Sequence, residues 1–196
     1  MEKVPFSRLI LGSASPRRKS LLKSIGFAFD VVTADIEEVF PMHLEREKIT
    51  DYLAIQKAWA LKRHLDSDTL ILTADTIVWF DGAVMEKPGH REEAERTLKA
   101  LSGNWHEVIT SVCFTTEKTQ FLKHAITRVK FAPLTDQMIQ TYIGSGQPMD
   151  KAGAYGIQEW IGLVGVERID GSYTNVVGLP TQLVYKTLST MAGSAI

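Results

Sequence analysis

The spacing of apolar and polar residues predicts alternating strands and helices along most of the chain. Residues 69–80 are almost continuously apolar and rich in β-branched side chains, which is typical of a strand buried on both faces. Residues 45–65 repeat an apolar position every four residues, as an amphipathic helix does. Similar patterns predict strands at 9–11, 27–32, 105–115, 121–131 and 161–169, and helices at 16–25, 90–101, 134–143 and from 181 to about 191.

These elements predict an α/β fold with a mixed, twisted sheet flanked by helices. A hairpin signal at Asp81-Gly82 occurs in the same chain as strand–helix units, and a sheet built from both is mixed. A chain of 196 residues fits one domain. We expect that single domain, residues 1–196, to form two lobes around a central cleft, with a division near residue 134.

Composition and charge narrow the classes of function. The chain is 44% hydrophobic and 23% charged, and its net charge of −1 argues against a protein that coats nucleic acid. It has no apolar run of membrane-spanning length and no apolar signal segment near its first residues, so we expect no membrane partner and a cytoplasmic location. The single Cys113 cannot form an internal disulfide and is expected to be a buried strand thiol.

A turn of small residues at 12–15 leads from a strand into a helix. Ser15 suits the N-cap and Pro16 the first helical position. Arg17 and Arg18 then lie in the first turn, where basic residues are unfavourable unless an anion joins them. The pattern favours a phosphate site over two solvated surface arginines.

Charged residues also follow or interrupt the predicted strands. Asp35, Glu37 and Glu38 follow strand 27–32 and form either a Mg²⁺ site or a solvated acidic loop. Asp75 interrupts the buried strand 69–80, where an unpaired carboxylate is costly, which indicates a function.

Four further titratable positions each allow a structural or a functional role. Lys57 falls within an apolar helical stripe and either extends to the surface or points into a cleft, and we favour the cleft. His106 is expected to have a structural role. Glu86 and Lys87 lie near the end of a strand, where a surface ion pair is the alternative to a functional role.

The stretch from Asp150 to Gln158 is unsuited to regular structure. Gly153 and Gly156 disfavour both a helix and a strand. The stretch suits a fixed loop that lets a ligand approach the main chain while Lys151 and Gln158 reach toward that ligand. An ordinary glycine-containing connection is the alternative.

With these residues in view, the sequence resembles the Maf family, the septum-formation-inhibitor Maf-like nucleoside triphosphate pyrophosphatases. The resemblance extends from about residue 9 to residue 188. It rests on six short landmarks in order, each weak alone and specific together: residues 13–18, 74–78, 86–88, 101–103, 150–158 and 171–180.

The resemblance implies a fold like that of the inosine triphosphate pyrophosphatases and hydrolysis between the α- and β-phosphates of a nucleoside triphosphate. It also implies a divalent cation, Mg²⁺ or Mn²⁺, and a homodimer. The proton acceptor falls on Asp75, and the base-selecting positions fall on Arg17, Thr76 and Gln158. Our hypothesis adds Ser13, Arg18, Lys57, Lys87 and Lys151 for the substrate, and Glu37 and Glu38 with Asp75 for the metal.

The Gly-Ile-Gln end of the 150–158 stretch resembles the branch of the family that acts on dTTP and UTP. The branch that acts on 7-methylguanosine triphosphate has Glu at the position of Gln158. An amide offers a donor and an acceptor, which match the N3–H and carbonyl of uracil or thymine. Gln56 departs from the family, in which a charged residue commonly precedes the lysine. Three alternatives stay open: a non-catalytic nucleotide-binding regulator of division, a pyrophosphatase that prefers purine nucleotides, and a simple phosphatase.

Overall fold

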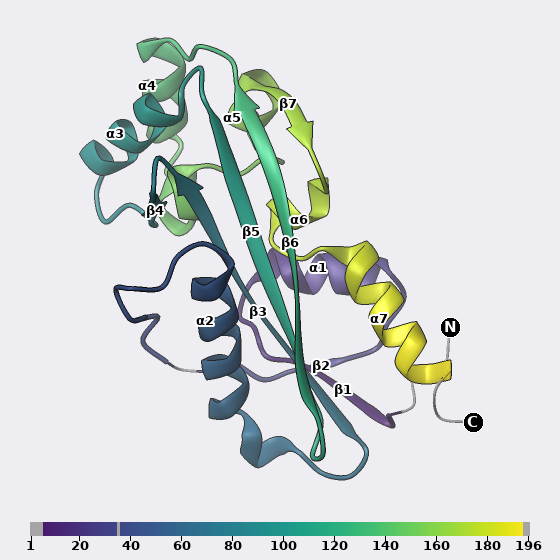
Figure 1. Ribbon diagram of the computed structural model, residues 1–196. Helices are drawn as coiled ribbons and strands as arrows, with labels where there is room; N and C mark the ends of the chain where they lie inside the picture. Colours follow the sequence, from purple (N-terminus) through teal and green to yellow (C-terminus); the bar gives the residue numbers. More distant parts are fainter. Residues whose placement is uncertain (1–5, 35, 194–196) are drawn as a thin grey trace. The chain divides into compact units, whose positions relative to one another are not determined.

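The computed structural model describes residues 6–34 and 36–193, and within them seven strands form one mixed sheet (Figure 1). The strands are β1 (Arg8–Leu11), β2 (Asp30–Val31), β3 (Thr69–Phe80), β4 (Ala83–Met85), β5 (Trp105–Thr115), β6 (Gln120–Phe131) and β7 (Val166–Asp170). Their order is β2-β1-β3-β5-β6-β7, and β4 pairs with β3. β1 is parallel to β2 and β3, whereas β4 and β7 are antiparallel to their partners. The predicted fold class is confirmed.

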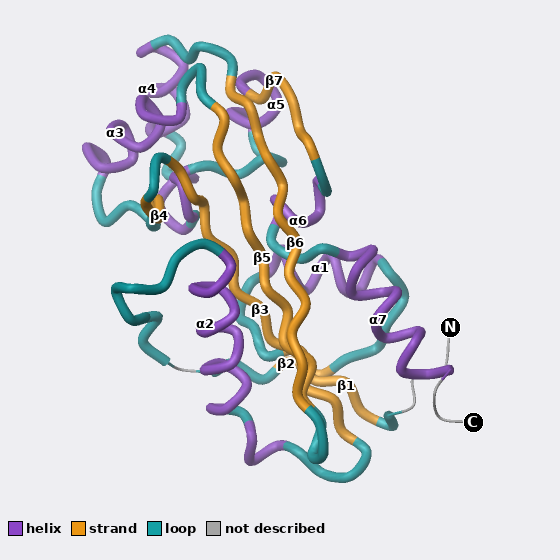
Figure 2. The backbone as a smooth tube through the Cα atoms, in the orientation of Figure 1, coloured by secondary structure: helices purple, strands orange, loops and turns teal. Residues whose placement is uncertain are grey.

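Helices separate the strands along the chain except at the β3–β4 and β5–β6 connections (Figure 2). They are α1 (Pro16–Ser24), α2 (Glu47–Ala60), α3 (Arg91–Leu101), α4 (Asp136–Gly144), α5 (Trp160–Gly165), α6 (Tyr173–Val177) and α7 (Thr181–Gly193). Three short 3₁₀ segments cover Lys62–His64, Gln147–Asp150 and Ala152–Ala154. No helix in the described part of the chain is long and apolar enough to cross a membrane.

The chain divides into two compact units, and β3, β5 and β6 each contribute residues to both. Unit 1 consists of Met1–Asp75, Thr110–Ala125 and Gly178–Ile196, and unit 2 of Thr76–Ile109 and Ile126–Val177. None of these boundaries coincides with the expected division near residue 134, which lies inside unit 2. The cleft stays a prediction.

In unit 1, alternate residues of β3 pack into different clusters. Leu70 and Leu72 join a core with Leu22 of α1 and Val184 of α7, whereas Ile71 packs against Leu61 beyond the end of α2. Successive side chains of a strand point to opposite faces. The expectation that this strand is buried on both faces is therefore confirmed.

Unit 2 has its own core around Phe131 of β6. Leu98 of α3 and Tyr142 of α4 belong to it, and so do Tyr155 and Ile157 from the segment between α4 and α5. The 150–158 stretch is thus packed against strands and helices of its own unit. This agrees with the expected fixed loop.

The strand predicted at 161–169 is wrong in its first half. Residues 160–165 form α5, and only Val166–Asp170 form a strand. A Cβ at Gly162 would lie 2.2 Å from the Ile157 carbonyl oxygen, so this turn of helix needs a glycine for close backbone contact. The apolar run gave no sign of that contact, because a short apolar run fits a helix or a strand equally well.

Two smaller expectations also change. Of the strand expected at 27–32, only Asp30–Val31 pair with a neighbour, although Phe27 is buried in the core of unit 1. The turn expected at 171–175 is shorter, because α6 begins at Tyr173, and the Ser172 hydroxyl accepts from the Asn175 N–H near its start.

Candidate active site

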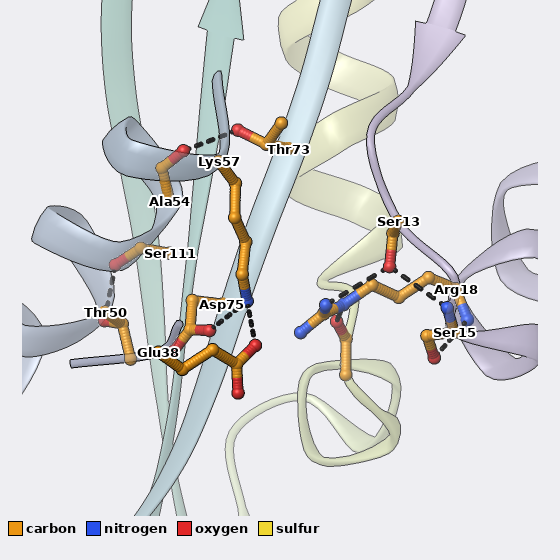
Figure 3. A network of polar contacts seen from close by, with 11 residues as sticks. Ser13, Ser15, Arg18, Glu38, Thr50, Ala54, Lys57, Thr73, Asp75 and Ser111 are labelled. Atoms are coloured by element: carbon orange, nitrogen blue, oxygen red, sulfur yellow. Dashed lines mark hydrogen bonds and ion pairs between the residues drawn. The ribbon is translucent and has the colours of Figure 1, made fainter. Parts of the chain in front are cut away.

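The start of α1 places Arg18 in a defined position beside Ser13. The Ser15 hydroxyl accepts from the Arg18 N–H at 3.4 Å and Pro16 occupies the first helical position, as predicted. The Arg18 guanidinium donates from Nε to the Gly178 carbonyl at 2.8 Å and from Nη1 to Ser13 Oγ at 3.4 Å (Figure 3). These bonds hold a cationic group at a helix N-terminus, which itself attracts anions.

The electrostatic surroundings of Arg18 include charges of both signs. Burial lowers the pKa of its guanidinium, the carboxylates of Asp75 and Glu38 raise this pKa, and the neighbouring Arg17 lowers it further. Arg17 and Arg18 therefore concentrate positive charge at the helix start, and the carboxylates of Asp75 and Glu38 interact electrostatically with Arg18.

Lys57 of α2 joins the two carboxylates. Its Nζ lies 2.6 Å from Asp75 Oδ1 and 2.6 Å from Glu38 Oε1 (Figure 3). Lys57 is 8% exposed and Asp75 5% exposed, whereas the Glu38 side chain is 45% exposed. The ammonium therefore does not extend to the surface, and the buried Asp75 has the charge partner that its position requires.

Buried hydroxyls attach α2 to the strands behind it. Thr73 Oγ1 of β3 donates to the Ala54 carbonyl at 2.7 Å (Figure 3), and Ser111 Oγ of β5 donates to Asp51 Oδ1 at 2.5 Å. Thr50 Oγ1 lies 2.6 Å from Ser111 Oγ. Our reading of the sequence missed these contacts. Their signal was the presence of small hydroxyl residues in otherwise apolar strands.

In unit 2, Lys151 has a different place from the one expected. It is buried, and its Nζ donates to the Gln147 carbonyl at 2.6 Å, to Asp150 Oδ1, and to Glu159 Oε1 at 2.8 Å. A lysine ammonium has three N–H donors, so each has an acceptor inside unit 2. Lys151 therefore neutralises charge beneath the loop, and its expected role toward a ligand stays a prediction.

The other predicted site residues of unit 2 are more exposed to solvent than Lys151. Gln158 is exposed on a turn directly before α5. Thr76 follows Asp75 in β3 and is half-buried, and Lys87 is exposed after β4. Gln158 therefore presents its amide to solvent from an otherwise packed segment.

His106 lies beneath the same segment. It is buried, its Nε2 is 2.7 Å from the Tyr155 hydroxyl, and its ring packs near Tyr155 and Phe131. Burial lowers the pKa of this imidazole to about 4. The ring is therefore neutral near pH 7, in keeping with the expected structural role.

Comparison with other proteins identifies the family. The family described as Maf-like protein matches residues 8–191. The chain belongs to the Maf family. Over 189 residues it is 50% identical to the dTTP/UTP pyrophosphatase of Phocaeicola vulgatus, covering 96% of this chain and 98% of that protein. It is 44% identical over 190 residues to the dTTP/UTP pyrophosphatase of Flavobacterium johnsoniae, covering 97% of this chain and 98% of that one.

A third Maf relative and one solved structure complete the comparison. The dTTP/UTP pyrophosphatase of Flavobacterium psychrophilum is 47% identical over 184 residues, which is 94% of each chain. The solved structure of the Staphylococcus aureus Ham1 protein has a TM-score of 0.46 and 11% identity, over 64% of this chain and 72% of that one.

The predicted metal ligands of this Maf chain are only partly brought together. Glu38 and Asp75 meet at Lys57, Glu37 is exposed, and Asp35 lies outside the described residues. Among residues 6–34 and 36–193, no group of three or more His, Cys, Asp or Glu side chains could hold a metal ion. Mg²⁺ usually binds to one or two protein carboxylates together with water and substrate phosphates. The pair Glu38 and Asp75 fits that mode, and a role for Glu37 stays a prediction.

Proposed function

We propose that this Maf protein hydrolyses dTTP and UTP to the nucleoside monophosphate and pyrophosphate. Three relatives that match nearly its whole length are named dTTP/UTP pyrophosphatases. The observation that carries the proposal is the buried Asp75, whose carboxylate lies 2.6 Å from the Lys57 ammonium and shares that ammonium with Glu38. A carboxylate in a buried strand with a cation beside it is suited to proton transfer, whereas a carboxylate that only aids solubility would lie on the surface.

The helix start at Arg17 and Arg18 would receive the triphosphate. Free N–H groups and two guanidinium groups offset phosphate charge there, and Ser13 keeps Arg18 in place through its hydroxyl. Arg18 has few alternative positions, because its Nε is also bound to the Gly178 carbonyl. A guanidinium that is already oriented loses little freedom when the substrate binds.

Asp75 would accept the proton of the attacking water. Its Oδ1 is bonded to Lys57, so we assign the transfer to Oδ2. The water oxygen forms a bond to the α-phosphorus, the bond from that phosphorus to the oxygen bridging to the β-phosphate breaks, and pyrophosphate leaves with the bridging oxygen. A divalent cation bound by Glu38 and Asp75 would offset phosphate charge and lower the pKa of a bound water. Without the cation, Lys57 fixes the orientation of both carboxylates through its two ion pairs.

Gln158 would select the base. Its exposed amide can donate to a carbonyl oxygen of uracil or thymine and accept from the N3–H of the same base. Guanine presents an N1–H and an amino group, and both are donors. Two adjacent donors suit a carboxylate rather than an amide, and this supports uracil and thymine nucleotides over guanine nucleotides.

One assay tests the proposal against its alternatives. The protein is incubated with Mg²⁺ and separately with dTTP, UTP, CTP, GTP and inosine triphosphate, and pyrophosphate and orthophosphate are quantified. We expect pyrophosphate from dTTP and UTP. Orthophosphate alone would identify a simple phosphatase. Pyrophosphate mainly from inosine triphosphate would identify a pyrophosphatase that prefers purine nucleotides. No turnover of any nucleotide would favour a non-catalytic regulator.

The variant Asp75→Asn identifies the proton acceptor. An amide of the same shape cannot take the proton, so we expect turnover to fall by at least about 100-fold. Binding of UTP, measured by titration calorimetry, should persist. Activity equal to that of the wild type would remove Asp75 from the mechanism.

Two further expectations belong to the same proposal. We propose that the protein acts in the cytoplasm, where its nucleotide substrates occur, and that it forms a homodimer, as the family resemblance implies. Sedimentation equilibrium at micromolar concentration checks the second expectation, because it gives a mass near twice that of the chain for a dimer.

A further inference from the structure

A closed set of polar contacts lies beneath the turn that carries Gln158. Glu159 Oε1 accepts from Lys151 Nζ at 2.8 Å, and Glu159 Oε2 accepts from the Tyr142 hydroxyl. The same Tyr142 oxygen accepts from the Gly156 N–H at 3.1 Å. Tyr142 therefore connects the main chain of Gly156, two residues before Gln158, to the side chain of Glu159, the residue directly after it.

The charges of Lys151 and Glu159 are largely removed from solvent. Lys151 is 6% exposed, and the Glu159 side chain is 14% exposed. Every donor of the ammonium has an acceptor, and Glu159 uses both of its oxygens. Loss of one partner would leave a buried charge or hydroxyl unsatisfied, which is more costly than an exposed bond of the same kind.

The main chain around these contacts lies close to the side chains of Glu159 and Val78. A Cβ at Gly156 would lie 2.7 Å from Glu159 Cδ, and one at Gly153 would lie 2.8 Å from Val78 Cγ2. Gly153 also has a φ of 69°, and Ala154 follows with a φ of 57°, which is unusual for a residue with a side chain. A backbone held in such conformations at a loop is a mark of a functional constraint.

We propose that Tyr142, Glu159 and Lys151 are positioning residues for base selection, which hold the main chain on both sides of Gln158 so that its amide meets the base in one orientation. The inference rests on the proposed function. An amide selects a base only if its donor and its acceptor face the right atoms together, because a rotated amide offers the wrong group to each. None of the three residues needs to touch the substrate.

The test compares Tyr142→Phe with the wild type on UTP and GTP. The substitution keeps the ring in the core and removes only the oxygen that joins Gly156 to Glu159. We expect kcat/KM for UTP relative to GTP to fall about tenfold, mainly through a higher KM for UTP, since tenfold corresponds to one net hydrogen bond to a charged group. The kcat for UTP should stay within about threefold, because Asp75 is unaltered.

A control separates positioning from a general loss of stability. Thr127→Val removes another buried hydroxyl of unit 2, one that accepts from the Ser172 N–H and Asn175 Nδ2 and is not part of this set. It should lower the melting temperature by a similar amount and leave the selectivity unchanged. If Tyr142→Phe also leaves the selectivity unchanged, the three residues are structural only and the inference is wrong.

A double-mutant cycle makes the test sharper. In a Gln158→Ala background there is no amide to orient, so Tyr142→Phe should have no further effect on selectivity. An equal loss in both backgrounds would show that Tyr142 acts independently of Gln158, which would also overturn the inference. Glu159→Gln should behave like Tyr142→Phe, since it removes the charge that binds Lys151.

Hydrogen exchange of the Gly156 amide tests the same attachment without substrate. The Gly156 amide should exchange with solvent faster in Tyr142→Phe than in the wild type, and unchanged protection would contradict the proposed attachment. If the wild type hydrolyses neither dTTP nor UTP, the proposed function itself fails and the inference with it. Unchanged selectivity in an active enzyme rejects the inference alone.

Discussion

Lys57 and Asp75 neutralise one another in the interior of unit 1. Asp75 Oδ1 makes a 2.6 Å contact with Lys57, and the second partner of Lys57, Glu38, lies at the same distance with a side chain that is 45% exposed. Lys57→Met keeps the length of the side chain and leaves the Asp75 carboxylate buried without its cation. We expect the free energy of unfolding to fall by about 3 kcal/mol, measured by urea denaturation.

The partner variant gives the control for that loss. In Lys57→Met combined with Asp75→Asn, the carboxylate charge is gone, so much of the lost stability should return while activity stays absent. A double variant no more stable than Lys57→Met would mean that the pair contributes through packing and not through charge.

Gln158 permits a second prediction at the scale of one residue. Because it is exposed, Gln158→Glu should leave the free energy of unfolding within about 0.5 kcal/mol of the wild type. A carboxylate only accepts hydrogen bonds, so it repels the carbonyl groups of uracil and suits the donors of guanine. We expect kcat/KM for UTP to fall at least about tenfold and that for GTP to rise. Equal losses for both nucleotides would argue against base reading by this side chain.

Single residues differ in how far the sequence revealed their place. A carboxylate in a continuous apolar strand and a lysine in an apolar helical stripe both stand out, and the structure joins Asp75 with Lys57. Lys151 is different, because a lysine before a glycine-containing stretch carries no sign of whether it faces a ligand or the interior. Its acceptors include Glu159, eight residues further on, which only tertiary packing brings to it.

At the scale of elements, α2 has to be held in one register for Lys57 to meet Asp75. The Thr73 hydroxyl makes a 2.7 Å bond to the Ala54 carbonyl, one turn before Lys57. Thr73→Val removes that bond with little change in volume and should destabilise unit 1 by about 1 kcal/mol. We also expect kcat for UTP to fall about threefold, because small displacements of a catalytic group lower the rate.

The chain offers a matched control for that prediction. Thr187 of α7 makes the same kind of bond, from its hydroxyl to the Leu183 carbonyl at 2.7 Å, within one helix of unit 1. Thr187→Val should cost a similar amount of stability and leave kcat unchanged. If both variants lower kcat equally, the effect reflects general destabilisation and not the register of α2.

Elements with strong local signals were predicted well, and those defined by distant contacts were not. The N-cap Ser15 with Pro16 predicted the start of α1, and β3 has the expected bounds, because caps and long apolar runs act locally. The helix α5 was missed, since what permits it is the contact of Gly162 with the Ile157 backbone. The hydroxyl contacts that hold α2 were missed for the same reason.

For the whole molecule, His106 makes the free energy of unfolding depend on pH. Its imidazole is buried among Tyr155 and Phe131, and burial lowers its pKa from 6.5 to about 4. The folded protein therefore binds this proton less readily than the unfolded chain does. The stabilising contribution is fully present above about pH 6.5 and is lost as the pH falls toward 4, and it amounts to about 3 kcal/mol.

The variant His106→Gln isolates this contribution, because an amide can still bond to the Tyr155 hydroxyl and does not titrate. The free energy of unfolding should be measured by urea denaturation from pH 7 to pH 4 for both proteins. We expect the wild type to lose about 3 kcal/mol more than His106→Gln over that range. Parallel pH profiles would mean that the imidazole reaches a proton acceptor or water in the folded state. The stability of unit 2, which carries the loop of Gln158, would then not depend on a neutral His106.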